Sequence, residues 1–200
     1  WLGLPPTHPI VASSSPLTEK VDDLLRLEAA GVAAVVLPSL FEEQISIESH
    51  DLDTYLTHGA ESYAEATTYF PDMLGYNRGP TGYLERLTEA KKALHIPVIA
   101  SLNGVSRGGW TRYAKRMQEA GADAIELNVY HVPTDPEQDG VAVEAMYTDL
   151  VAEVVASVRI PVAVKLTPFL SAPVHMAQRL GAAGAKGLVL FNRFYQPDFD

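Results

Sequence analysis

The stretch Ala29-Ala-Gly-Val-Ala-Ala-Val-Val36 decides the fold, because the same pattern of residues occurs twice more along the chain. The other two copies are Glu119-Ala-Gly-Ala-Asp-Ala-Ile-Glu126 and Ala182-Ala-Gly-Ala-Lys-Gly-Leu-Val189. In each copy a glycine stands at the expected end of a helix, and a short link and an apolar strand follow it. Three such junctions predict repeating βα units, which implies right-handed crossovers and a parallel sheet.

Six short apolar runs are predicted as the strands of this sheet. They are rich in Val, Ile and Leu, and they are apolar on both faces, as parallel strands covered on both sides are. The predicted strands are 9–13, 33–37, 97–102, 124–128, 161–166 and 187–192. Apolar residues at spacings of three and four predict helices over 17–30, 107–120, 141–158 and 171–183. A further helix is expected over 81–94.

Six βα units in sequence favour an α/β fold of the (β/α)8 TIM-barrel type. A complete barrel has about 250 residues, whereas this chain has 200. We therefore expect one barrel domain over 1–200, incomplete at its C-terminus, from which the last two βα units are absent. The interval from about 40 to 95 contains no strand pattern of the same quality and is interpreted as an insertion. Because the chain starts at Trp1, we also expect it to be a fragment.

Composition excludes several classes of function. The chain contains no cysteine, which rules out disulfide scaffolds, thiolate zinc sites and cysteine nucleophiles. The net charge of −10 disfavours nucleic acid and anionic membranes as partners. The six histidines show no metal-ligand spacing, and neither a dinucleotide-binding glycine motif nor a P-loop is present. A small-molecule ligand remains as the expected partner.

Every predicted strand ends in polar side chains, and in a barrel these ends surround the active site. The residues are Ser13, Ser39, Asn103, Asn128, Lys165 and Asn192. Lys165 stands out, because an amine within an apolar strand requires an anion or several acceptors nearby. An internal ion pair with Glu126 is the structural alternative to a ligand.

The amides at the strand ends suit the edge of a heterocycle, since each offers two donors and an acceptor. Asn128 and Asn192 are the best candidates, although either could instead cap the following turn. Asn103 precedes a glycine, so that a role in a turn is equally compatible with its position. Ser15 can serve as the N-cap of a helix.

Four of the strands together resemble dihydroorotate dehydrogenase. They are Pro9-Ile-Val-Ala-Ser13, Ala124-Ile-Glu-Leu-Asn128, Pro161-Val-Ala-Val-Lys-Leu166 and Leu188-Val-Leu-Phe-Asn192. Two further phrases, Leu37-Pro-Ser-Leu-Phe-Glu-Glu-Gln44 and Leu190-Phe-Asn-Arg-Phe-Tyr-Gln-Pro197, resemble the dihydroorotate dehydrogenase-like proteins of bacteria.

The resemblance implies an FMN-dependent barrel that oxidises a CH–CH bond of dihydroorotate or a related dihydropyrimidine. Such an enzyme is expected in the cytoplasm, in pyrimidine biosynthesis, and commonly as a homodimer. Its flavin would contact Ala12, Ser13, Ser39, Asn128 and Lys165. Its substrate would contact Asn77, Asn103, Asn128 and Asn192. Lys165 would also serve catalysis, by stabilising the anionic reduced flavin.

Two positions depart from the family pattern. His131 occupies the place of the catalytic Cys or Ser, and an imidazole can act as a base at neutral pH. Pro38 occupies the place of a lysine, and it brings neither a charge nor an N–H group. These departures keep two alternatives open. One is an aldolase or isomerase that uses Lys165 as a Schiff-base amine, and the other is a flavin-binding relative without catalysis.

Overall fold

The computed structural model describes residues 1–4, 7–41, 80–103, 109–129, 131 and 133–192. Its strands are β1 (Val11–Ala12), β2 (Ala34–Phe41), β3 (Val98–Asn103), β4 (Ala124–Asn128), β5 (Val162–Leu166) and β6 (Gly187–Leu190). Its helices are η1 (Pro16–Thr18), α1 (Val21–Ala29), α3 (Pro80–Ala93), α4 (Gly109–Glu119), α5 (Gly140–Ser157) and α6 (Pro173–Ala182).

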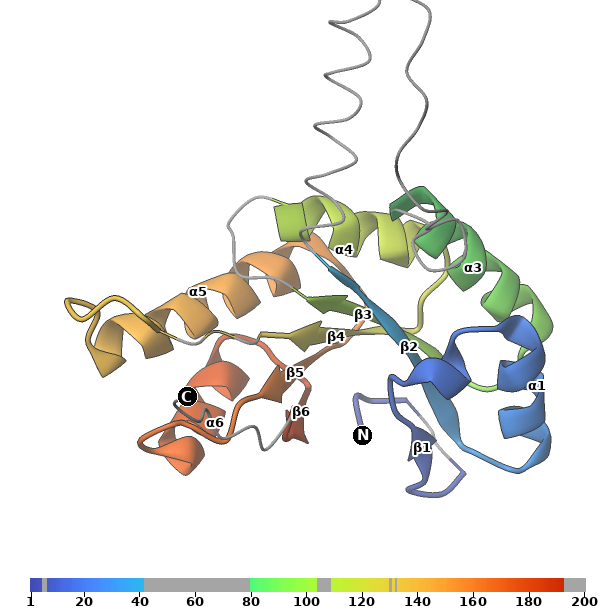
Figure 1. Cartoon of the computed structure of the whole chain (residues 1–200), viewed down its shortest axis with the longest axis horizontal. Coiled ribbons are helices and arrows are strands. Elements are labelled where there is room, and N and C mark those ends of the chain that lie inside the picture. The colour runs from blue at the N-terminus through green and yellow to red at the C-terminus, as the bar shows by residue number, and fades with distance from the viewer. Residues whose placement is uncertain (5–6, 42–79, 104–108, 130, 132, 193–200) are drawn as a thin grey trace, which may run out of the picture.

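The six strands form one parallel sheet in the order of the sequence, β1-β2-β3-β4-β5-β6. Figure 1 shows the helices α1, α3, α4, α5 and α6 in an arc around the outside of the curled sheet. This arrangement is a partial (β/α)8 TIM barrel, as the repeated junctions predicted. No helix within the described ranges has the length and apolarity needed to cross a bilayer.

Element boundaries differ from the sequence prediction mainly near the N-terminus. The strand predicted over 9–13 is formed only by Val11–Ala12. The helix predicted over 17–30 is divided, because Lys20 is extended between η1 and α1. The Thr18 hydroxyl closes η1 by accepting from the Ser15 N–H and donating to the Ser15 carbonyl. Ser15 therefore stands at the start of a helical turn, as its predicted N-cap position requires.

The predicted insertion over about 40–95 includes both strand and helix. β2 continues to Phe41, and α3 contacts β2, β3 and the neighbouring helices α1 and α4. α3 thus takes the place of the second outer helix of the barrel. Residues 42–79, which make up most of the interval, lie outside the described residues.

The three glycine junctions adopt one geometry. Gly31, Gly121 and Gly184 have φ values of +92°, +98° and +104°. At the first junction the Gly31 N–H donates to Glu28, and the Val32 N–H donates to Leu27. These are the bonds of a Schellman motif, and the other two junctions repeat them. The repeated sequence therefore ends each helix and turns the chain into the next strand.

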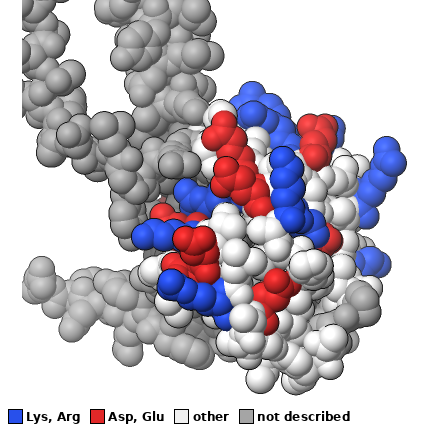
Figure 2. Space-filling model, turned by 90° about the vertical axis from the view of Figure 1, so that its right-hand side faces the viewer, with Lys and Arg blue, Asp and Glu red and all other residues white. Residues whose placement is uncertain are grey.

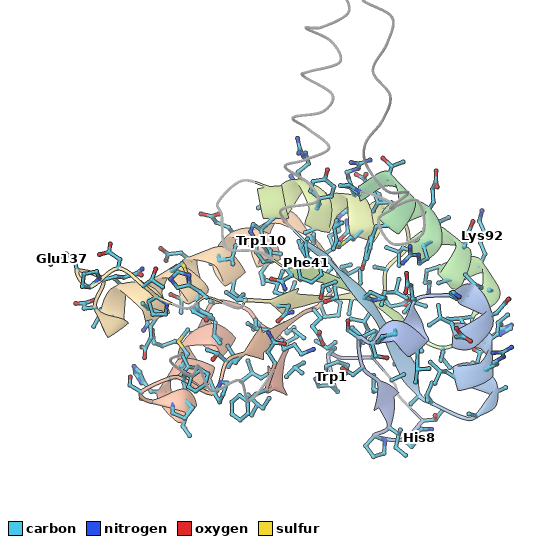
Figure 3. The ribbon with its side chains drawn as sticks, in the orientation of Figure 1. Trp1, His8, Phe41, Lys92, Trp110 and Glu137 are labelled. Carbon is cyan, nitrogen blue, oxygen red and sulfur yellow. The ribbon has the colours of Figure 1, made fainter. Side chains whose placement is uncertain are left out.

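Two apolar clusters hold the barrel. The larger one lies between the strands and the surrounding helices, and it includes Leu37, Leu102, Leu127 and Leu166. The smaller one fills the inside of the sheet at the amino ends of the strands, where Leu2 packs with residues such as Ile99. Trp1 lies in the gap between the β1 and β6 sides, close to Gly187 (Figure 3). The carboxyl ends of the strands are left for polar side chains.

Candidate active site

A cleft of about 830 Å³ opens at the carboxyl ends of the strands. Its volume falls within the range of ordinary small-molecule sites. The turn after β1, the end of β2, helix α3 and the ends of β4, β5 and β6 contribute side chains to it. Strands far apart in sequence therefore meet at one rim, because parallel strands in sequential order carry their carboxyl ends to the same side.

Lys165 points into this cleft and pairs with Glu126 from β4, with the Nζ atom 3.1 Å from Oε1. The side chains of Lys165 and Glu126 are 10% and 2% exposed. The ion pair considered at the sequence level is thus present. Lys165 can still bind a ligand in the cleft, because its ammonium has three N–H donors and one of them bonds to Glu126.

Asn128 is the immediate neighbour of Lys165 in the register of β4 and β5. Its Oδ1 atom is buried and has no hydrogen-bond partner among the described residues, although the residue lines the cleft. A buried acceptor without a partner is costly. Because Asn128 lines the cleft, its side-chain amide lies beside the space that a ligand with an amide-like edge would occupy.

A register shift separates Val36 from Ser39 in the β2–β3 pairing. The Val35 N–H donates to the Pro97 carbonyl, so odd-numbered residues of β3 direct their backbone groups towards β2. Ser101 belongs to this set. Its N–H and its carbonyl both bond the Tyr83 hydroxyl from α3, at 2.9 and 3.2 Å. Tyr83 thus supplies hydrogen bonds at the irregularity beside Pro38.

The same irregularity places two hydroxyls together inside the sheet. Ser39 Oγ and Ser101 Oγ lie 2.7 Å apart, and Ser101 stands next to Glu126 in the β3–β4 register. Burial raises the pKa of the Tyr83 hydroxyl above its ordinary value. Tyr83 therefore stays protonated, and it can donate to Ser101 and accept from it at the same time.

The cleft collects five of the predicted residues, namely Ser13, Ser39, Asn128, Lys165 and Asn192. Ala12 and Asn103 are described but are not among its lining residues, and Asn77 lies outside the described residues. His131 does not line the cleft either. Its Nε2 atom lies 3.4 Å from Oε1 of Gln138, and its role as a base stays a prediction.

Among the polar and charged residues of the cleft, Glu19, Tyr83 and Arg86 were not singled out from the sequence. Tyr83 and Arg86 are three residues apart on α3, so they share one face of the helix. That spacing was visible in the sequence. Which strand the face would cover was not, because α3 follows the long interval for which the sequence shows no strand pattern.

Comparisons with known proteins agree with the resemblance seen in the strands. A family described as dihydroorotate dehydrogenase matches residues 72–195. The catalytic subunit of dihydroorotate dehydrogenase B (NAD(+)) from Thermoplasma volcanium is 28% identical over 192 residues, which is 94% of this chain and 59% of that protein. Dihydroorotate dehydrogenase A (fumarate) from Lactobacillus delbrueckii is 29% identical over 111 residues, or 54% of this chain and 36% of that protein. The chain thus spans less than two thirds of these relatives.

Solved structures agree on the fold. A crystal structure of 2,3-dimethylmalate lyase matches with a TM-score of 0.54 at 16% identity, and the match covers 93% of this chain and 57% of that one. At this identity the match concerns the barrel architecture alone.

Proposed function

The chain belongs to the dihydroorotate dehydrogenase family, and from that premise we propose that it is an FMN-dependent oxidoreductase. Its substrate is dihydroorotate or a related dihydropyrimidine, which loses two hydrogens from a CH–CH bond. The observation that carries the proposal is the pairing of a cation and an unsatisfied buried acceptor, Lys165 and Asn128, at the rim of one cleft.

These residues fit a flavin. The pyrimidine edge of the isoalloxazine carries carbonyl oxygens and one N–H, so an ammonium and an amide oxygen are complementary to it. In this proposal Ala12, Ser13, Ser39, Asn128 and Lys165 hold the cofactor. When bound, FMN supplies the acceptor for the hydride.

The substrate side of the proposal uses amides and a base. Asn192 lines the cleft, and its backbone N–H donates to the Leu166 carbonyl at a distance of 2.8 Å. With Asn77, Asn103 and Asn128 it orients the ring. His131 is the proposed base: it would take the proton from one ring carbon and hold it on the imidazole, and it would have to reach the cleft from its place beside Gln138.

Glu126 disfavours the alternative of a Schiff-base enzyme. A lysine nucleophile must direct its nitrogen at the carbonyl carbon of the substrate, whereas Nζ of Lys165 donates to the Glu126 carboxylate at 3.1 Å. Treatment with borohydride and a carbonyl substrate is therefore expected to leave Lys165 unmodified. An adduct on Lys165 would favour the aldolase.

The direct test is reconstitution with FMN followed by anaerobic titration with dihydroorotate. The flavin absorbance should bleach, and a dihydropyrimidine panel should rank the substrates. Asn128→Ala should weaken flavin binding, whereas Val174→Ala on the outer face of α6 should not. A protein that takes up no FMN would refute the proposal. Flavin uptake without bleaching by any member of the panel would favour a non-catalytic relative.

A further inference from the structure

The charges at the cleft are not equivalent. Among the described residues that line it, Lys165 and Arg86 are cations and Glu19 is an anion. Lys165 is paired with the buried carboxylate of Glu126. Arg86 forms no ion pair with any carboxylate of the described chain, yet its guanidinium is charged at every relevant pH. Among the described residues, the guanidinium of Arg86 is therefore a charge at the cleft that is not held in an ion pair with a carboxylate.

Arg86 stands at the β2–β3 side of the cleft. It lies one turn after Tyr83 on α3, and the Tyr83 hydroxyl contacts the Ser101 backbone. Arg86 lines the same cleft as Pro38 and Ser39, which stand at the register shift in β2. Arg86 is thus close to the irregular end of β2. There Pro38 offers a ligand neither a charge nor an N–H group.

We propose that Arg86 is the specificity-determining residue of the cleft, which binds the carboxylate of a carboxylated pyrimidine ring. The inference rests on the proposed function and names the group that selects its substrate. A guanidinium presents two parallel N–H donors that match the two oxygens of a carboxylate. Selection follows because a ring without the carboxylate gains nothing from Arg86.

The helix also provides a matched control. Lys92 lies on the same helix α3, is exposed, and points outward (Figure 3). Figure 2 shows acidic and basic side chains interspersed on the outer face that α1 and α3 present. Lys92→Gln therefore removes one positive charge from α3 without touching the cleft.

The experiment measures the Kd of orotate and of uracil, which share a ring and differ by the carboxylate. Arg86→Gln should raise the Kd of orotate roughly tenfold to hundredfold, as expected for a charged hydrogen-bonded pair. The Kd of uracil should change less than about twofold, because uracil has no carboxylate and such a change is as small as that of a neutral surface substitution. Arg86→Lys should fall between the wild type and Arg86→Gln for orotate, and Lys92→Gln should match the wild type. Far-ultraviolet circular dichroism checks that each variant is folded.

Three outcomes separate the inference from its competitors. An equal loss for orotate and uracil would overturn it, because Arg86 would then act on the shape of the cleft. Weaker binding of FMN, with riboflavin unchanged, would assign Arg86 to the flavin phosphate and would also overturn it. If dihydroorotate bleaches the flavin but the Kd of orotate does not depend on Arg86, the role of Arg86 is refuted and the proposed function is not. Arg86-dependent orotate binding without flavin uptake would support it and refute the flavin proposal.

Discussion

A single hydroxyl, that of Tyr83, satisfies both backbone groups of Ser101. Tyr83→Phe leaves a buried N–H and a buried carbonyl without partners, so we expect a loss of about 2–4 kcal/mol in the free energy of unfolding. Urea denaturation measures this loss. Tyr113→Phe, at a buried tyrosine of α4, is the control and should cost less, since it leaves both backbone groups of Ser101 bonded to Tyr83.

The effect of Tyr83→Phe on the free energy of unfolding should depend on pH. Burial raises the pKa of Tyr83 in the folded protein, so the unfolded chain releases this proton first. The stabilisation by Tyr83 is therefore complete below about pH 10, the ordinary tyrosine pKa, and declines above it. The difference in unfolding free energy between the wild type and Tyr83→Phe should shrink as the pH rises above about 10. A constant difference would contradict this assignment.

The Lys165–Glu126 pair shows at the residue scale how stability and function separate. Lys165→Met leaves the carboxylate of Glu126 buried and unpaired, which should cost about 3–5 kcal/mol. The double variant Lys165→Met, Glu126→Leu should recover most of this stability, because both charges are gone. Neither variant should bind flavin tightly, as fluorescence titration would show. A double variant as unstable as the single one would mean that Lys165 stabilises the fold in some way other than by pairing with Glu126.

At the scale of elements, the three glycine junctions are alike in sequence and unlike in surroundings. A Cβ atom on Gly184 would lie 2.8 Å from Cγ1 of Val155 on α5, whereas a Cβ on Gly31 would meet nothing within 4 Å. Both glycines have positive φ, so alanine at either position costs about 1–2 kcal/mol in strain. Gly184→Ala should cost roughly 1–3 kcal/mol more, because it also overpacks the α5–α6 contact.

Thermal and urea unfolding of the two alanine variants test this difference directly. If Gly31→Ala proved as destabilising as Gly184→Ala, the close approach of α5 to the last junction would not matter. Val155→Ala combined with Gly184→Ala should recover part of the extra loss, since it removes the Val155 methyl groups that the new Cβ would meet.

At the scale of the whole molecule, the sheet has two edges. Within the described residues β1 pairs only with β2, and β6 pairs only with β5. The strand β6 also exposes Leu190, at 62%. Unpaired strand edges with exposed apolar side chains promote association. The 200-residue chain should therefore self-associate as its concentration rises, which analytical ultracentrifugation would detect.

Leu190→Lys should shift this association towards the monomer, since a charged edge residue disfavours pairing of strands. Val174→Lys on α6, at a position that is 75% exposed, is the matched control and should not shift it. Equal sedimentation of the two variants would place the interface elsewhere, as in a homodimer built on another face. One cooperative unfolding transition of the monomer would support a single domain over 1–200.

The order of the elements and the chemistry of the rim could be predicted from the sequence, because both depend on local patterns. Apolar runs of strand length, glycine at helix ends and polar residues at strand ends are each contained in a few consecutive residues. The register that puts Asn128 beside Lys165 follows from the same repetition. The sequence thus determined the partial barrel and named five residues of the cleft.

Tertiary structure alone decided how these residues are partnered. Lys165 and Glu126 are 39 positions apart, and Tyr83 and Ser101 are 18 apart on different elements. Whether such groups meet depends on register and on the face that a helix turns inward, which no local pattern specifies. The packing of Leu2 inside the sheet and the position of Arg86 at the cleft have the same origin. Composition and periodicity determine which side chains are available, and the curling and register of the sheet determine which of them become neighbours.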